Sequence, residues 1–317
     1  MDKQTPYTSP LRTIKATAPV RICDNGGWTD TWFAEHGQIC NIAIAPCVEV
    51  EIVVYRRVDE RQPVITIDAR NFGERYGLRE PMTTWQKHPL LEAAIVQSGV
   101  VERLAVAGAE KTAVIISIAS QMPPGAATGT SAAVCVALLA ALDRLCDGQR
   151  TPHDIAYAAH AVETKLLGQQ SGIQDQLAAA YGGISFIEMF AYPQAKVQQL
   201  ALSASFLAEL EQRLLLVYLG KPHASSAIHE MVIRDLEDAG PDNPKIEVLR
   251  QYAVAARDAL LAEDLARFGQ ALAANTVAQA ALHQALVSAE AQEIIGIAQA
   301  HGALGWKVNG AGGDGGS

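Results

Sequence analysis

The chain has 317 residues, of which 49% are hydrophobic, and its formal net charge at pH 7 is −9. This length is enough for two domains with a substantial core, and the apolar content is ordinary for a soluble globular protein. The acidic balance argues against a nucleic acid or an anionic membrane surface as the main partner.

The sequence also indicates the compartment. Its N-terminal residues lack the apolar stretch of a secretory signal, and its longest strictly apolar run, 132–142, is too short to cross a bilayer. The five cysteines are an odd number and form no Cys-x-x-Cys pair, which favours reduced thiols. We therefore expect a cytoplasmic protein.

The first part of the chain predicts mainly strands. Apolar and β-branched residues indicate strands at 39–44, 48–54 and 64–68, within a strand-rich stretch that begins near Ile14. A helix is predicted from Leu90 to Ser98. A further strand, at 112–118, leads into a Pro-Pro-Gly loop.

The second part predicts mostly helices. Helices are expected from Ser131 to Cys146 and from Thr151 to Leu167, the latter because a hydroxyl residue, a proline and an early acid mark a helix start. Strands are expected at 184–188 and, ending before Gly220, at 214–219. From Pro244 onward the chain has helical periodicity.

These elements predict an α+β fold, because runs of strands are followed by runs of helices without strict alternation. The composition changes near residue 200. We therefore predict an N-terminal domain at 1–200 and a C-terminal domain at 201–317.

The segment 123–133 is the most informative motif, because small and turn-forming residues run directly into an apolar helix. Unpaired N–H groups and the positive end of the helix dipole make such a junction a site for phosphates. An ordinary capped helix after a Pro-Gly turn is the alternative. The predicted nucleotide-binding residues are Pro124, Gly125, Ala126, Ala127, Gly129, Thr130, Ser131 and Ala132.

Two further segments accompany this loop. Residues 18–31 form a strand-like start that breaks at Gly26-Gly27, and residues 307–317 form a second glycine-rich loop. In this order and spacing, the three segments resemble the three motifs of the GHMP kinase superfamily (galacto-, homoserine, mevalonate and phosphomevalonate kinases). Residues 26–31 and 171–176 are most similar to its fucose kinase and heptose 7-phosphate kinase branch. The resemblance implies a two-domain fold with the active site in a cleft between the domains, and ATP and Mg²⁺ as cofactors.

The resemblance also implies catalytic roles. It makes Asp175 the catalytic base, with Arg21 nearby to keep it ionised and to steady the transferring phosphoryl group. It makes Glu163, with the hydroxyl of Ser131, the Mg²⁺ site. Without it, Asp175 is a solvated loop carboxylate, Arg21 a surface residue at a strand end, and Glu163 an i,i+4 partner on an exposed helix face.

Sugar contacts are expected from the first and third motifs. A short carboxylate such as Asp30 accepts two hydroxyl hydrogen bonds at once, which discriminates between stereoisomers. Trp28 either offers its ring face to a sugar or packs in the core. The loop with Lys221 and His223 either binds substrate or is solvated. The predicted substrate-binding residues are Gly26, Gly27, Thr29, Asp30, Gly310, Ala311, Gly312 and Gly313.

The sequence departs from the family pattern at three places. Ala127 and Thr128 replace the usual Gly-Leu, and Thr130 replaces the first serine. Asp314 introduces a negative charge where a small residue is usual. The chain ends at Ser317, whereas members of the family continue through another strand and helix, so we expect a truncated or unusual C-terminal domain.

Together these features predict an ATP- and Mg²⁺-dependent sugar kinase that phosphorylates the anomeric hydroxyl of a heptose 7-phosphate or a fucose-like sugar. The chain contains no Gly-x-x-x-x-Gly-Lys-Ser/Thr, which excludes a simple P-loop kinase. A catalytically silent relative that senses a sugar or nucleotide is the alternative, and a superfamily decarboxylase is a weaker one. The expected partner is a small-molecule sugar or sugar phosphate, and the sequence leaves monomer and homo-oligomer open.

Overall fold

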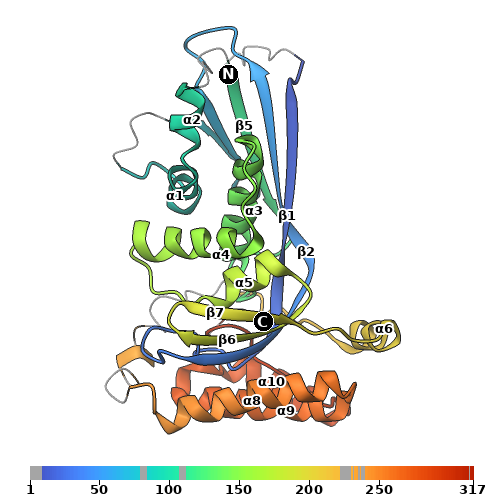
Figure 1. Cartoon of the computed structure of the whole chain (residues 1–317). Helices are drawn as coiled ribbons and strands as arrows, with labels where there is room; N and C mark the ends of the chain where they lie inside the picture. Colours follow the sequence, from blue (N-terminus) through green and yellow to red (C-terminus); the bar gives the residue numbers. More distant parts are fainter. Residues whose placement is uncertain are drawn as a thin grey trace.

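A computed structural model describes residues 9–78, 84–106, 112–221, 230, 232–234, 236, 240–313 and 315–317. Its centre is a seven-stranded sheet in the order β4-β3-β5-β2-β6-β7, with β1 paired to the other edge of β2 (Figure 1). The strands are β1 (Arg12–Asn25), β2 (Gly37–Arg56), β3 (Ile65–Ala69), β4 (Glu74–Gly77), β5 (Thr112–Ser120), β6 (Ile184–Ala191) and β7 (Gln194–Gln199).

Helices cover the sheet in two groups. In Figure 1, α1, α3, α4 and α5 lie beside the upper sheet, whereas α8, α9 and α10 lie below its lower end. The α-helices are α1 (Pro89–Ser98), α2 (Val100–Val106), α3 (Thr130–Leu145), α4 (Pro152–Ala161), α5 (Gln174–Tyr181), α6 (Ala204–Arg213), α8 (Pro244–Leu261), α9 (Leu265–Leu282) and α10 (Ala289–Ala300).

Strand β2 extends through both halves of the sheet. The sequence predicts two strands here, but the structure has one, because the break at Ala45-Pro46 is absorbed by a bulge. Pro19 pairs with Cys47 and Val20 with Ile44, so two residues of β2 have no counterpart on β1. A bulge tolerates a proline, which has no N–H to donate. Beyond it β2 changes partner, from β6 at 37–42 to β5 at 48–56.

The fold has two main hydrophobic cores. The larger core joins the sheet to α1, α3 and α4, with Ile52, Ile116 and Leu138 fully buried. The second joins the lower sheet to α6, α8 and α9 through residues such as Phe186 and Phe268. The cores attach β1 to helices at both ends of the sheet, which fixes the loop after β1 between them.

Strand β1 and helix α3 run side by side and are tied together at two points. Near the start of β1, the Arg12 guanidinium donates to the carbonyl oxygens of Arg144 (2.8 Å) and Leu145 (3.3 Å) at the C-terminal end of α3. Further along β1, Arg21 Nη1 donates to the carbonyl oxygen of Ala127, just before α3 begins (2.6 Å). One strand therefore holds both ends of the helix.

Most of the remaining predicted elements lie where the sequence places them, but 214–219 is not a strand, so that prediction is wrong. Its apolar side chains face different surroundings: Leu215 is 85% exposed, whereas Leu216 packs against both main cores. A buried strand would need both faces covered.

Among the described residues, no helix is long and apolar enough to cross a membrane.

Candidate active site

The loop between β5 and α3 forms one wall of a cleft of about 370 Å³. Residues 125–131 line the cleft, whereas Pro124 is exposed outside it and Ala132 is buried within α3. Gly129 adopts a left-handed conformation (φ +70°) at the helix start. A Cβ on Gly129 would lie 3.1 Å from the carboxyl carbon of Asp175, so glycine permits this close approach.

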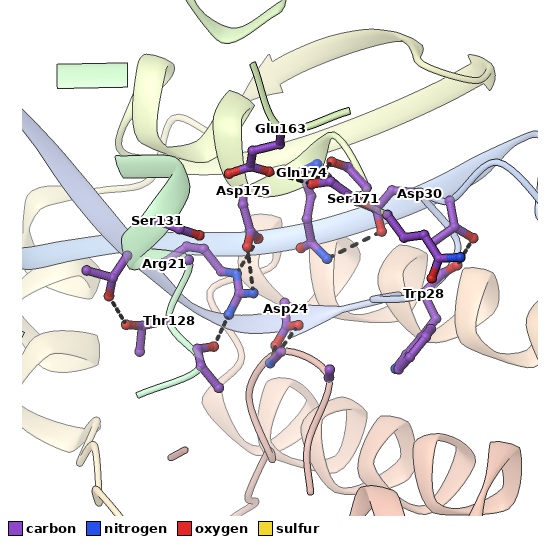
Figure 2. Close-up of a pocket in the computed structure, with 18 of the residues that line it drawn as sticks. Arg21, Asp24, Trp28, Asp30, Thr128, Ser131, Glu163, Ser171, Gln174 and Asp175 are labelled. Atoms are coloured by element: carbon purple, nitrogen blue, oxygen red, sulfur yellow. Dashed lines mark hydrogen bonds and ion pairs between the residues drawn. The ribbon is translucent and has the colours of Figure 1, made fainter. Parts of the chain in front are cut away.

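Arg21 and Asp175 face each other across the cleft, from β1 and from the first turn of α5 (Figure 2). Arg21 Nε donates to Asp175 Oδ1 at 2.7 Å, and Nη2 donates to Oδ2 at 3.2 Å. The arginine side chain is 5% exposed, and the aspartate, at 27%, is open to the cleft. The pair is therefore bidentate, and the carboxylate remains accessible to a ligand.

The charges around Arg21 act together. Burial alone would lower the pKa of the guanidinium, but the carboxylates of Asp175, Asp24 and Asp30 raise it above its usual value. Arg21 consequently remains a cation in this cleft. The sequence alternative of a surface arginine is wrong, because the residue is buried.

Glu163 lies in a π-helical turn, Val162–Leu166, that follows α4 directly. Its Oε2 accepts hydrogen bonds from Ser171 Oγ and Gln176 Nε2, both at 2.7 Å, while its Oε1 is buried and has no partner among the described residues. Burial raises the pKa of Glu163 to about 7, against the opposing hydrogen bond from Ser171. At 5% exposure it is not on an exposed helix face.

Asp30 lies at the other end of the cleft. Its Oδ2 accepts the backbone N–H of Gln174 at 3.0 Å, and Gln174 Nε2 lies 3.4 Å from Oδ1. A Cβ on Gly172 would come within 2.0 Å of Oδ2, so the carboxylate packs directly on that glycine. Burial raises the pKa of Asp30 to about 6, although the Gln174 amide opposes this shift.

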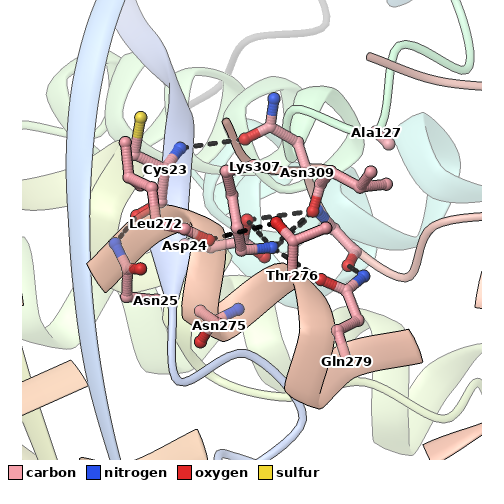
Figure 3. A network of polar contacts seen from close by, with 12 residues as sticks. Cys23, Asp24, Asn25, Ala127, Leu272, Asn275, Thr276, Gln279, Lys307 and Asn309 are labelled. Atoms are coloured by element: carbon pink, nitrogen blue, oxygen red, sulfur yellow. Dashed lines mark hydrogen bonds and ion pairs between the residues drawn. The ribbon is translucent and has the colours of Figure 1, made fainter. Parts of the chain in front are cut away.

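The third glycine-rich loop is held by a buried polar network (Figure 3). Asp24 accepts the backbone N–H of Gly310 at 3.0 Å and forms an ion pair with Lys307 at 3.3 Å. Asn309 Oδ1 accepts the backbone N–H of Cys23 at 2.9 Å. These contacts bring Gly310 and Ala311 to the cleft beside the first motif.

Several predicted residues do not reach the cleft lining. Gly26, Gly27 and Thr29 are buried in the turn after β1, where the Thr29 hydroxyl donates to the Gly26 carbonyl at 2.7 Å. In the third motif, Gly313 donates to the Leu286 carbonyl instead, and the adjacent Gly312 packs against that same carbonyl. These residues set the shape of the first and third motif loops but do not line the cleft.

Four other residues were singled out in the sequence, and the structure describes two of them. Trp28 touches the cleft, but its ring packs in a third apolar cluster with Phe33 and Leu249. Lys221 forms an exposed ion pair with Glu290 at 2.9 Å. His223 and Asp314 lie outside the described residues.

The structure adds side chains that the sequence motifs contain but whose roles we did not predict. Asp24 and Lys307 lie within the first and third motifs, and Ser171 and Gln174 lie within the 171–176 segment. Their residue types alone do not predict this, because polar side chains beside a glycine turn are mostly exposed and the sequence does not show which of them are buried. Among the described residues, no three His, Cys, Asp or Glu side chains cluster to hold a metal by themselves.

The chain is similar to known proteins in both sequence and fold. The model of the GHMP kinases N terminal domain matches residues 94–183. A mevalonate kinase from Thermococcus sibiricus is 30% identical over 315 residues, which cover 95% of this chain and 87% of that protein. The chain belongs to the GHMP kinase family.

Other members of the GHMP kinase family are also similar to the chain. The bifunctional fucokinase/GDP-fucose pyrophosphorylase of Arabidopsis thaliana is 29% identical over 262 residues, covering 80% of this chain. The chain spans only 24% of the length of that relative. A D-glycero-D-manno-heptose 1-phosphate kinase structure from Bacteroides thetaiotaomicron superposes with a TM-score of 0.70 at 22% identity, covering 94% of this chain and 86% of that one. The α+β GHMP kinase fold is thereby confirmed.

Proposed function

We propose that this GHMP kinase transfers the γ-phosphoryl group of ATP to a sugar hydroxyl, the anomeric hydroxyl of a heptose 7-phosphate or a fucose-like sugar. One observation carries the proposal: the Asp175 carboxylate, held by Arg21, lies against the N-terminal end of α3. A base and a phosphate site therefore adjoin in one cleft. The similarity to a fucokinase supports a sugar acceptor.

In the proposed reaction, the acceptor hydroxyl oxygen forms a bond to the γ-phosphorus. The bond from that phosphorus to the β,γ-bridging oxygen breaks, and ADP leaves. Asp175 accepts the hydroxyl proton or orients the hydroxyl, and either role suits a loose transition state. Arg21 places positive charge beside the transferring group.

Residues 125–131 form the proposed phosphate site. The first N–H groups of α3 lack partners within the helix, and the helix dipole adds partial positive charge at this end. Gly125 and Gly129 both have positive φ, which turns the loop sharply around the cleft. The Ser131 hydroxyl is exposed at the same edge.

The residues present fit a divalent cation. Glu163 Oε1 is buried without a partner among the described residues, and the hydrogen bonds from Ser171 and Gln176 both go to the other oxygen of this carboxyl group. Mg²⁺ prefers hard oxygen ligands and usually takes one or two carboxylates together with phosphates in kinase sites. We propose Glu163 and Ser131 as its protein ligands, and the bound cation would neutralise charge on the phosphates.

We also propose that the protein is cytoplasmic, where its five cysteines would stay free thiols. We also propose the division into an N-terminal domain at 1–200 and a C-terminal domain at 201–317.

Calorimetric titration with ATP–Mg²⁺, followed by a phosphate-transfer screen over sugars, tests the function. We expect nucleotide binding below millimolar concentration and transfer to at least one sugar. Binding without transfer to any sugar would favour the silent relative. No nucleotide binding at millimolar concentration would contradict the kinase proposal altogether.

A further inference from the structure

The charge of the acceptor end of the cleft narrows the substrate class, an inference that rests on the proposed function. Four carboxylates line the described cleft, those of Asp24, Asp30, Glu163 and Asp175, whereas Arg21 is its single arginine or lysine among the described residues. That guanidinium is already engaged by Asp175 and by the Ala127 carbonyl. An anionic acceptor would find little positive charge here.

The carboxylates differ in how far they are neutralised. Asp24 has the buried Lys307 ammonium at 3.3 Å, and Asp175 has Arg21. Asp30 forms no ion pair with any described residue, although it is only 2% exposed. Its partners are the backbone and side-chain amides of Gln174. Asp30 is therefore a buried acceptor with hydrogen-bonding capacity left over.

Gln174 supplies a second acceptor beside it. The side chain is 7% exposed and lines the cleft, and its Oε1 is buried with no partner among the described residues. Its Nε2 lies 3.4 Å from Asp30 Oδ1, so the two side chains adjoin (Figure 2). Buried polar atoms of this kind are costly unless a ligand completes them.

We propose that the acceptor is a neutral sugar, and that Asp30 and Gln174 accept hydrogen bonds from two of its neighbouring hydroxyl groups. Hydroxyls supply the missing donors, whereas a phosphate or carboxylate group supplies charge that Asp30 repels. Of the two acceptors considered above, the fucose-like sugar is therefore preferred over the heptose 7-phosphate. A mevalonate-like carboxylic acid is disfavoured for the same reason.

Matched acceptor pairs test this inference directly. The purified full chain is assayed with ATP–Mg²⁺ and each of six acceptors. These are fucose, mannose, galactose, mannose 6-phosphate, galactose 6-phosphate and mevalonate. We expect kcat/KM to be about 10–100-fold higher for the better neutral sugar than for any phosphorylated one, a range typical of like-charge repulsion in a partly buried site. A higher kcat/KM for a sugar phosphate, or for mevalonate, overturns the proposal.

Two variants assign the effect to the named residues. Gln174→Met keeps the size and the backbone N–H but removes Oε1 together with the Nε2 contact to Asp30, so KM for the neutral sugar should rise about 10-fold with little change in kcat. Gln212→Met, on the exposed face of α6, is the matched control and should change neither. Asp30→Asn should shrink the preference for neutral over phosphorylated acceptors about 10-fold. An unchanged KM for Gln174→Met, or an unchanged preference for Asp30→Asn, contradicts the assignment.

Binding measurements separate this inference from the kinase proposal. The same sugars are titrated into the chain by calorimetry without ATP. Tighter binding of a neutral sugar than of its phosphate supports the inference even if no phosphoryl transfer occurs, in which case the proposed function alone fails. Equal or tighter binding of the sugar phosphate overturns the inference whether or not the chain is a kinase.

Discussion

One end of the cleft, the proposed phosphate site, is lined by one continuous segment, 125–131, whereas the proposed acceptor end is lined by side chains from separate segments. The first end offers backbone N–H groups and a helix dipole, which do not depend on side-chain identity. The second depends on Asp30, Gln174 and Asp175, each held by a specific contact.

This difference bears on the departures from the family pattern in the second motif. Ala127 and Thr128 replace the usual residues of the second motif, yet both still line the cleft. A site made of backbone tolerates such changes as long as the chain can adopt the turn. A site made of side chains does not, and the predictions below measure this contrast.

Asp175→Asn should have the largest effect, which is a loss of turnover. The amide keeps the shape but cannot take a proton, so turnover should fall about 10²–10⁴-fold if proton transfer matters, the range for a lost general base. Steady-state kinetics and calorimetry measure this, and ATP and sugar should still bind. Asp242→Asn, on the surface, is the control. Retained turnover in Asp175→Asn would refute the base role.

Glu163→Gln tests the proposed Mg²⁺ site of the cleft. The amide can still accept the bonds from Ser171 and Gln176 through its oxygen, but it places an NH₂ group where Oε1 now lies. The Mg²⁺ concentration needed for half-maximal turnover should rise about 10–100-fold, as for a lost carboxylate ligand, while the fold stays intact. Circular dichroism checks the fold. An unchanged Mg²⁺ requirement would move the metal elsewhere, and the exposed Glu293→Gln serves as control.

Gly129→Ala tests the other end of the cleft, where residues 125–131 lead into α3. A methyl group would lie 3.1 Å from the Asp175 carboxyl group at a residue with φ +70°, so the carboxylate must move. We expect kcat to fall about 10-fold and stability to fall by about 1–2 kcal/mol, the cost of a left-handed alanine. Gly302→Ala has the same backbone strain (φ +81°) in open space and should lose stability alone. Equal kinetics in the two variants would contradict the close approach.

Asp30→Asn acts on the stability of the folded chain, and its effect depends on pH. Because the pKa of Asp30 is about 6 when folded, against an ordinary 3.8, the native state binds the proton more tightly. The stabilising contribution of the protonated Asp30 carboxyl group is therefore fully present below about pH 4 and is lost as pH rises through 6. Asp30→Asn should gain on the order of 2–3 kcal/mol over the parent at pH 8 and almost nothing at pH 4.

Thermal unfolding at the two pH values, with Asp242→Asn beside it, measures this difference. Both variants lose one carboxylate, but only Asp30 is buried. A stability difference that is the same at pH 4 and pH 8 would show that ionised Asp30 carries no cost in the folded chain.

The motifs predicted much of this molecule. They placed Arg21 and Asp175 in one cleft although 154 residues separate them, because the resemblance supplied a contact that spacing cannot. They missed Gln174, since nothing in the sequence shows that its side chain lines the cleft beside Asp175. They also assigned Thr29 to the sugar, whereas its hydroxyl bonds to the turn that contains it.

The secondary structure shows the same limit. Periodicity located α3 and α8, which depend on local spacing, but predicted a strand at 214–219. A strand requires a partner edge, and apolar content alone cannot provide one. The bulge in β2 likewise depends on the register with β1, which is set by residues distant in sequence.

The double attachment of α3 to β1 has a mechanical consequence. Arg12 and Arg21, nine residues apart on one strand, fasten the far end of the helix and the loop before it. Sliding of α3 along its axis would break both attachments together, so the helix is held in place relative to β1. We therefore expect any opening that admits a nucleotide or releases a product to come from the opposite walls of the cleft, while residues 125–131 stay in place.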